Sequence, residues 1–289
     1  MISATLYNDP ACPWAYSESP AIRVIEWRYG DQLRWRLVLI GLTESASQYE
    51  ARGYTPIRGA LGQLRFRQRY GMPFSPAPKA RLSATARACR AVVAARLESP
   101  GSEWRVFRAL QLASFTTPLL LDDDAQLVAV LEDLPGIDAE AIIARLDDSE
   151  VTAAYEQDRA ASRTAAGSAA ELQGKTATSD GPVRYTAPSI VFECDGLQMV
   201  AGGFQAVEAY DVLVTNLDPT LERQAPPATP APLLERFPDG VTTQEVAALM
   251  THGNDAPDRF AAEVALLELV AAGQALRQPF GDDALWKPA

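Results

Sequence analysis

Residues 8–16 read Asn-Asp-Pro-Ala-Cys-Pro-Trp-Ala-Tyr and separate a strand-like segment from a helix-like one. Upstream, residues 2–7 alternate apolar and polar side chains, which is typical of a short strand ended by a turn. Downstream, Pro13 suits the first position of a helix, which a Gly-Asp pair then ends. Residues 33–40 alternate again and predict a second strand. The opening therefore predicts a βαβ unit with Cys12 at the start of its helix.

The long middle of the chain loses strand-like alternation and shows helical spacing instead. We expect residues 44–170 to be a helical insertion into the domain that the βαβ unit begins. The helices that we expect in it span residues 57–70, 79–98, 102–114, 123–133, 138–146 and 149–167.

Strand character returns after the insertion. Residues 189–194 and 197–200 are separated by Asp195-Gly196, which predicts a hairpin with a two-residue turn. A last helix of this domain is expected over residues 204–217.

The best domain boundary is a Pro-rich segment, residues 222–232, that favours an extended polyproline conformation. It follows a first domain over residues 1–221. Residues 233–289 read as three helices and a terminal β-ribbon, which predicts a small winged-helix-like module. Its charged residues sum to a negative balance, which argues against binding DNA phosphates. We expect the module to pack on the first domain, to cover its site or to mediate self-association.

Composition bounds the class of protein. The chain has 289 residues and 47% hydrophobic residues, enough for a substantial core. Its three cysteines are too few for a disulfide framework, and no signal peptide or membrane-spanning run is apparent, so we expect a soluble, cytoplasmic protein. A net charge of −11 disfavours nucleic acid and membrane surfaces as partners.

Cys12 is the candidate reactive residue. At the start of a helix, free N–H groups and the positive end of the helix dipole favour a thiolate. The alternative is a small buried cysteine that serves only for packing. Position alone leaves both open.

The segment from Asn8 to Tyr16 resembles the strand-to-helix segment of DsbA-like thioredoxin-fold proteins of the FrnE type, within the 2-hydroxychromene-2-carboxylate isomerase-like superfamily. In that family Cys-Pro-Trp-Cys follows Asp-Pro. A helical insertion, the run 186–189 (Thr-Ala-Pro-Ser) before a strand, and the run 202–204 (Gly-Gly-Phe) after the hairpin also match in order. The resemblance covers roughly residues 1–220 and implies an α/β thioredoxin fold.

The resemblance also implies site residues and an activity. Pro188 corresponds to the cis-proline that faces the active cysteine, and Ala187 would offer its backbone to a bound thiol compound or peptide. Pro13, Trp14 and Tyr16 complete the implied substrate surface, with the two aromatic residues as its apolar wall. The implied activity is that of a thiol–disulfide oxidoreductase.

Ala15 departs from the family because it occupies the position of the second, resolving cysteine. A single thiolate forms a mixed disulfide and then needs an outside thiol. The site is then a natural monothiol enzyme, a site that has lost redox function, or an engineered Cys-to-Ala trap. Cys89 is a candidate replacement for the resolving cysteine, although packing explains it as well, and Cys194 is expected in the core.

Other charged groups give weaker indications. Arg58, Arg65, Arg67, Arg69, Lys79 and Arg81 make a basic stretch that either binds carboxylates of a small thiol or is a solvated helix face. His252, the one histidine, favours a helix end, and the run 122–124 (three Asp) favours helix capping, so no metal site is expected.

Our leading interpretation is a monothiol oxidoreductase with no bound cofactor, which uses a low-molecular-weight thiol as co-substrate. Its partners would be a small thiol or a disulfide-containing protein or peptide, and a homodimer is compatible with the sequence. The alternatives are a non-catalytic thioredoxin-fold binding module and a thiol-dependent isomerase or transferase. The sequence does not choose among them.

Overall fold

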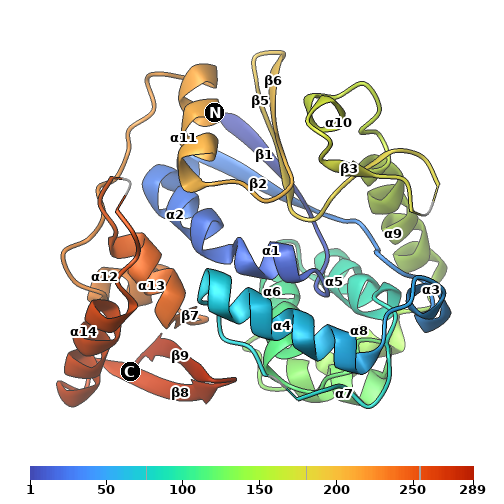
Figure 1. The fold of residues 1–289 in the computed structure, drawn as a ribbon, viewed down its shortest axis with the longest axis horizontal. Helices are drawn as coiled ribbons and strands as arrows, with labels where there is room; N and C mark the ends of the chain where they lie inside the picture. The colour runs from blue at the N-terminus through green and yellow to red at the C-terminus, as the bar shows by residue number, and fades with distance from the viewer. Residues whose placement is uncertain (76, 180, 254) are drawn as a thin grey trace.

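A four-stranded sheet organises the first domain of the computed structural model, which describes residues 1–75, 77–179, 181–253 and 255–289 (Figure 1). The strand order is β2-β1-β5-β6, and β1 runs parallel to β2 and antiparallel to β5. Its strands are β1 (Ile2–Asn8), β2 (Leu33–Leu39), β5 (Ser189–Cys194) and β6 (Leu197–Gly202). The expected βαβ opening and terminal hairpin are confirmed, and they meet where β1 pairs with β5.

The connection between β1 and β2 is two helices, α1 (Pro13–Ser17) and α2 (Ser19–Tyr29), and the prediction of one continuous helix was wrong. Glu18 ends α1 and begins α2. Pro20 explains the break, because it has no N–H to donate to the carbonyl four residues earlier.

The helical insertion is confirmed, with differences at its edges. Residues 79–85, expected as the first turns of a helix, form a loop, because the Asp122 carboxylate accepts from Ala84 N at 3.0 Å and Thr85 bonds to Asp9. Two short helices, α3 and α10, were not expected. The insertion comprises α3 (Ala46–Ala51), α4 (Pro56–Tyr70), α5 (Ala86–Glu98), α6 (Ser102–Thr116), α7 (Asp124–Leu131), α8 (Ala139–Ala144), α9 (Ser149–Ser162) and α10 (Ala169–Leu172).

The terminal hairpin turns as its sequence predicts. Asp195 and Gly196 have φ angles of 49° and 81°, so both adopt the left-handed conformation that tight hairpin turns favour. Helix α11 (Val207–Leu217) follows β6 and packs against it and against α2. A small ribbon of β3 (Thr176–Ala177) and β4 (Arg184–Tyr185) precedes β5 and was too short to be predicted.

The C-terminal module contains the three expected helices and the expected ribbon, together with an unexpected short strand, β7. Its sheet has the order β7-β9-β8. Its assignment to the winged-helix class stays a prediction. The elements are α12 (Ala231–Arg236), β7 (Val241–Thr242), α13 (Thr243–Met250), α14 (Arg259–Ala271), β8 (Ala275–Phe280) and β9 (Asp283–Pro288).

The module packs on the first domain through α13, which lies against α2 (Figure 1). The Pro-rich segment is tied down as well, because Trp27 Nε1 donates to Ala225 O at 2.9 Å. Val24 and Trp27 of α2 are buried with the apolar side chains of the module. The segment is therefore a packed connection rather than a free spacer.

A buried ion pair joins the module to α6. The Arg108 guanidinium donates to both carboxylate oxygens of Glu245, at 3.0 and 2.8 Å, and Ser19 of α2 donates to the same carboxylate. Burial opposes the charge of Glu245, but Arg108 outweighs it and lowers the pKa of this carboxyl to about 2. The pair therefore links α2, α6 and α13 at one point.

We expect Arg108→Met to lower the free energy of unfolding by about 3–5 kcal/mol, because it leaves the Glu245 carboxylate buried without its main partner. Arg105→Met is the matched control. Arg105 lies on the same helix and pairs with Asp239 of the module, but both side chains are more than a third exposed, so its loss should cost less than about 1 kcal/mol. Urea denaturation followed by circular dichroism measures both, and equal losses would contradict the assignment.

Candidate functional site

Cys12 lies at the N-cap of α1, directly after the turn that ends β1. Its N–H donates to Asp9 O at 3.1 Å. The buried Asp9 carboxylate holds the same turn by accepting from the N–H groups of Ala11 and Leu42, each at 2.9 Å, and from the Thr85 hydroxyl at 3.0 Å. The position of Cys12 is thus fixed by buried hydrogen bonds rather than by the short helix alone.

The Cys12 thiol faces the segment before β5. Its Sγ donates to Ala187 O at 3.1 Å, and the Ala187–Pro188 peptide bond is cis, as the resemblance implied. The register that pairs Tyr7 with Ser189 brings these segments together. Ala187 therefore offers its carbonyl to the protein's own thiol in this structure.

Burial is the largest influence on the Cys12 thiol and raises its pKa to about 12. The N–H groups of Ala15 and Trp14 and the charge of Arg184 act in the opposite direction, but they do not compensate. The helix start does favour a thiolate, as expected, but its effect is smaller than that of burial. Only 6% of Cys12 is exposed, so removal from water outweighs the helix end.

The other cysteines are free thiols in buried positions. Ala15, in the place of a resolving cysteine, is 1% exposed and packs with Cys12 and Ala187. Cys89 is fully buried on α5, and its Sγ lies 3.6 Å from Asp9 Oδ2, which gives it a structural partner. Cys194 ends β5 and contacts the Asp195 carboxylate at 3.7 Å.

The two aromatic residues of α1 have different surroundings. Trp14 is 44% exposed and makes edge-to-face contacts with Phe66, Tyr70 and Phe204. Tyr16 is fully buried, its hydroxyl donates to Pro73 O at 2.7 Å, and it does not line the cavity described below. Its expected place in the wall of the site is therefore corrected, because its ring packs on Phe74 and Phe115 in the core.

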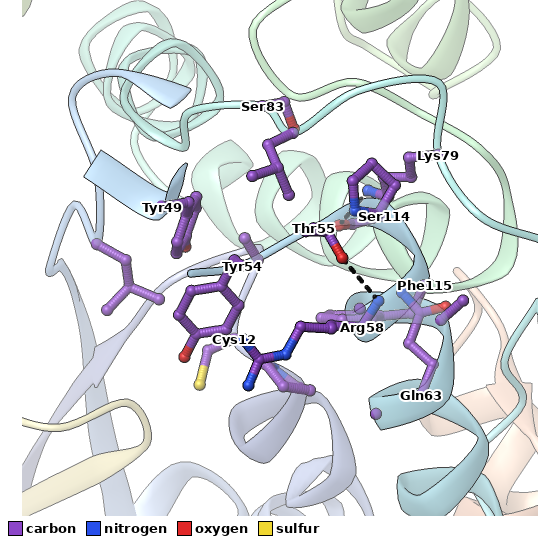
Figure 2. Close-up of a pocket in the computed structure, with 18 of the residues that line it drawn as sticks. Cys12, Tyr49, Tyr54, Thr55, Arg58, Gln63, Lys79, Ser83, Ser114 and Phe115 are labelled. Atoms are coloured by element: carbon purple, nitrogen blue, oxygen red, sulfur yellow. Dashed lines mark hydrogen bonds between the residues drawn. The ribbon is translucent and has the colours of Figure 1, made fainter. Parts of the chain in front are cut away.

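A cavity of about 970 Å³ opens beside Cys12, between α4 and the loops and helices of the insertion (Figure 2). Ala11, Cys12, Pro13 and Trp14 line it on the side of α1. Tyr49 and Tyr54, whose ring centroids are 5.4 Å apart, add an aromatic surface that the sequence gave no reason to expect. Ala187 and Pro188, which were expected to bind substrate, are not among its described lining residues.

The described lining of this cavity carries six basic side chains and no Asp or Glu. Arg58, Arg65, Lys79 and Arg81 belong to the basic stretch noted in the sequence, whereas Arg67 pairs with Asp282 at 3.2 Å and Arg69 stacks on Tyr70. The remaining two cations, which local sequence did not reveal, are Arg52 and Arg184.

The acidic run at residues 122–124 and His252 have the following surroundings in the structure. Asp123 caps α7 by accepting from Gln126 N, which confirms the capping role of the acidic run. His252 follows α13 and does not line the cavity. Within the described ranges, no three His, Cys, Asp or Glu side chains lie close enough to hold a metal ion, and no helix is long and apolar enough to cross a membrane.

A sheet of this topology, with a cysteine at the start of its first helix and a cis-proline opposite, defines the class of thioredoxin-like thiol proteins. A model of the DsbA-like thioredoxin domain matches residues 5–167, more than half of the chain. The chain therefore belongs to the DsbA-like thioredoxin domain family, which comprises thiol–disulfide oxidoreductases. No curated protein sequence matches it at a significant level.

Several solved structures share the fold. A putative protein disulfide isomerase from Nitrosomonas europaea is 20% identical, with a TM-score of 0.57 over 74% of this chain and 96% of that one. The cytosolic disulfide reductase DsbM from Pseudomonas aeruginosa is 19% identical, with a TM-score of 0.51 over 74% and 98%. A probable DsbA oxidoreductase from Streptomyces coelicolor is 16% identical, with a TM-score of 0.56 over 78% and 93%. At these identities the similarity establishes the fold.

We expect Cys12 to react slowly with iodoacetamide at pH 7, at least about a hundredfold slower than free cysteine, because so little of it is thiolate. Its rate should rise about tenfold per pH unit up to pH 10. Peptide mass spectrometry of the native protein reports each cysteine separately, with the fully buried Cys89 as the internal control. A plateau below pH 8 would contradict the raised pKa.

Glu18, at the junction of α1 and α2, is another buried titratable group. Burial raises its pKa to about 8, although its Oε1 accepts from Tyr210 OH at 2.8 Å and from Gln205 N at 3.3 Å. Its Oε2 has no hydrogen-bond partner among the residues that the structure describes. The folded protein therefore holds a proton that the unfolded chain releases near pH 4.5, and stability is lost as the pH rises from that value through 8.

Glu18→Gln removes this titration. The variant should have a free energy of unfolding within about 1 kcal/mol of the parent at pH 5 and should exceed it by a few kcal/mol at pH 8.5, by linkage. Denaturant titrations at the two pH values measure the difference. A gap that does not grow with pH would show that Glu18 is already ionised in the folded protein at neutral pH.

Proposed function

We propose that the protein is a monothiol disulfide oxidoreductase that acts on small anionic thiol disulfides, with Cys12 as the nucleophile. One observation carries the proposal: Cys12 lines a cavity whose described side chains include six cations and no carboxylate. In a chain of net charge −11, such a concentration of positive charge favours a ligand with carboxylates. The aromatic rings of Tyr49 and Tyr54 would contact the uncharged part of that ligand.

The chemistry is two successive exchanges. Cys12 sulfur attacks one sulfur of the bound disulfide R–S–S–R′, forms the mixed disulfide Cys12–S–S–R, and R′ leaves as a thiol that takes the Cys12 proton. A second thiol, R″SH, then attacks the R sulfur, releases R–S–S–R″ and returns the proton to Cys12. Ala15 provides no thiol for an internal second step, so the external thiol completes the cycle.

The raised pKa of Cys12 does not fit a strong oxidant. A protein oxidises substrates strongly when its reduced form is stabilised as a thiolate, whereas Cys12 is held as a neutral, buried thiol. Because Cys12 is regenerated in each cycle, the external thiol and the substrate disulfide set the net direction of exchange. The neighbour DsbM, described as a cytosolic disulfide reductase and also solved with GSH, is compatible with disulfide reduction that uses a small thiol. We therefore propose a cytoplasmic location and a low-molecular-weight thiol as co-substrate.

A second candidate function follows from the same thiol. Cys12 stays protonated and already donates to a carbonyl oxygen, so it is able to donate to the sulfur of a bound small thiolate without any change of oxidation state. This is the chemistry that a thiol-dependent isomerase or transferase requires. The two candidates differ in whether Cys12 becomes covalently modified.

Incubation with a peptide carrying a glutathione mixed disulfide, in the presence of glutathione, tests the proposal. We expect release faster than free cysteine achieves at the same concentration, reduction of the rate to the uncatalysed level in Cys12→Ser, and an unchanged rate in the control Cys194→Ser. Mass spectrometry should detect a glutathione mixed disulfide on Cys12. Release no faster than with free cysteine would overturn the oxidoreductase. Bound glutathione with an unmodified Cys12 would then favour the isomerase or transferase.

A further inference from the structure

Lys79 differs from the other cations that line the cavity. It is one of three lysines among 26 basic residues, and it lies in the loop between α4 and α5 that was expected to be helical. Its ammonium donates to the hydroxyl of Ser114 on α6 at 3.4 Å, a long hydrogen bond to a buried neutral group. Figure 2 shows this pair at one end of the cavity and Cys12 at the other.

No carboxylate pairs directly with Lys79 within the described part of the chain. The nearest acidic influence is Asp122, but that carboxylate is occupied by Arg81 at 2.8 Å and by Ala84 N at 3.0 Å. From α4, Arg58 and Arg65 line the same cavity and add positive charge. Lys79 is thus a partly buried ammonium whose described hydrogen-bond partner is a neutral hydroxyl.

We propose that Lys79 and Ser114 form a carboxylate-binding site at the end of the cavity remote from Cys12. The site selects small thiols and thiol conjugates that carry a carboxylate, and it takes up a proton when the carboxylate binds. This inference rests on the proposed function for the identity of the ligand class, but not on any redox step at Cys12.

The expected proton uptake follows from the presence of a lysine, whose ammonium can lose its proton, at position 79. Burial lowers the pKa of the Lys79 ammonium to about 8, and Asp122 opposes only part of that fall. A bound carboxylate supplies the missing opposite charge and would raise the pKa again. Arginine stays protonated throughout this range and cannot show the effect, which makes lysine the distinctive residue here.

Isothermal titration calorimetry with S-methylglutathione tests the site, because this probe has two carboxylates and no thiol for exchange. We expect uptake of about half a proton or more per ligand at pH 8.5 and almost none at pH 6, from measurements in two buffers of different ionisation enthalpy. Lys79→Met should weaken binding at pH 7 by about tenfold or more. The dimethyl ester of the probe should bind with similarly reduced affinity.

The Lys79→Arg variant keeps a positive charge at this position but removes the group that gains a proton when the ligand binds. This variant should bind S-methylglutathione within a fewfold of the parent affinity but take up no proton at pH 8.5, a result that a purely structural role for Lys79 would not produce. Lys175→Met, outside the cavity, is the matched control and should leave both quantities unchanged.

Equal affinity of Lys79→Met and the parent, or undiminished proton uptake in Lys79→Arg, would overturn the proposal, as would failure of the parent to bind the probe. A failed disulfide-release assay with normal proton-linked binding would reject the redox function and retain this site. Normal disulfide release without proton-linked binding would retain the redox function and reject the carboxylate-binding site.

Discussion

The hydrogen bond from the Cys12 thiol to Ala187 O joins two segments that are 175 residues apart, and the chemistry of the site depends on it. It exists because β1 and β5 pair antiparallel, which places the end of β1 beside the start of β5. The same pairing covers the sulfur and removes it from water. The fold therefore orients the thiol well but stabilises it in the protonated form, and burial rather than the helix end decides its ionisation.

A protected thiol and a basic cavity together form a selective site. An exposed thiolate would react with any disulfide in solution, whereas Cys12 is 6% exposed and largely protonated. The surrounding cations focus positive potential in an otherwise acidic molecule, so anionic ligands reach a higher concentration there than neutral ones. Under the proposed function, selection by charge before reaction would compensate for a nucleophile that is weak at rest.

Sequence patterns predicted the sheet, the helical insertion and the position of Cys12, because alternation, helical spacing and turn residues are local signals. The resemblance of the motif placed the cis bond at Pro188. The sequence did not predict the direction of the Tyr16 side chain, the loop around Lys79 or the raised pKa of Cys12. Each depends on contacts between distant segments: Tyr16 with Pro73, Lys79 with Ser114, and Cys12 with Ala187.

No residue of the described cavity lining belongs to the module, but Leu285 and Phe280 of the module share a packed apolar cluster with the lining residues Phe115 and Phe66. Glu245 holds α2 through Ser19 and α6 through Arg108, and these helices belong to the opposite halves of the thioredoxin domain, the sheet layer and the insertion. The insertion cannot hinge away from the sheet without separating this buried ion pair, in which Arg108 is 10% exposed and Glu245 is not exposed at all. The ion pair therefore opposes a clamshell opening of α2 away from α6. The C-terminal module acts as a brace between these two helices.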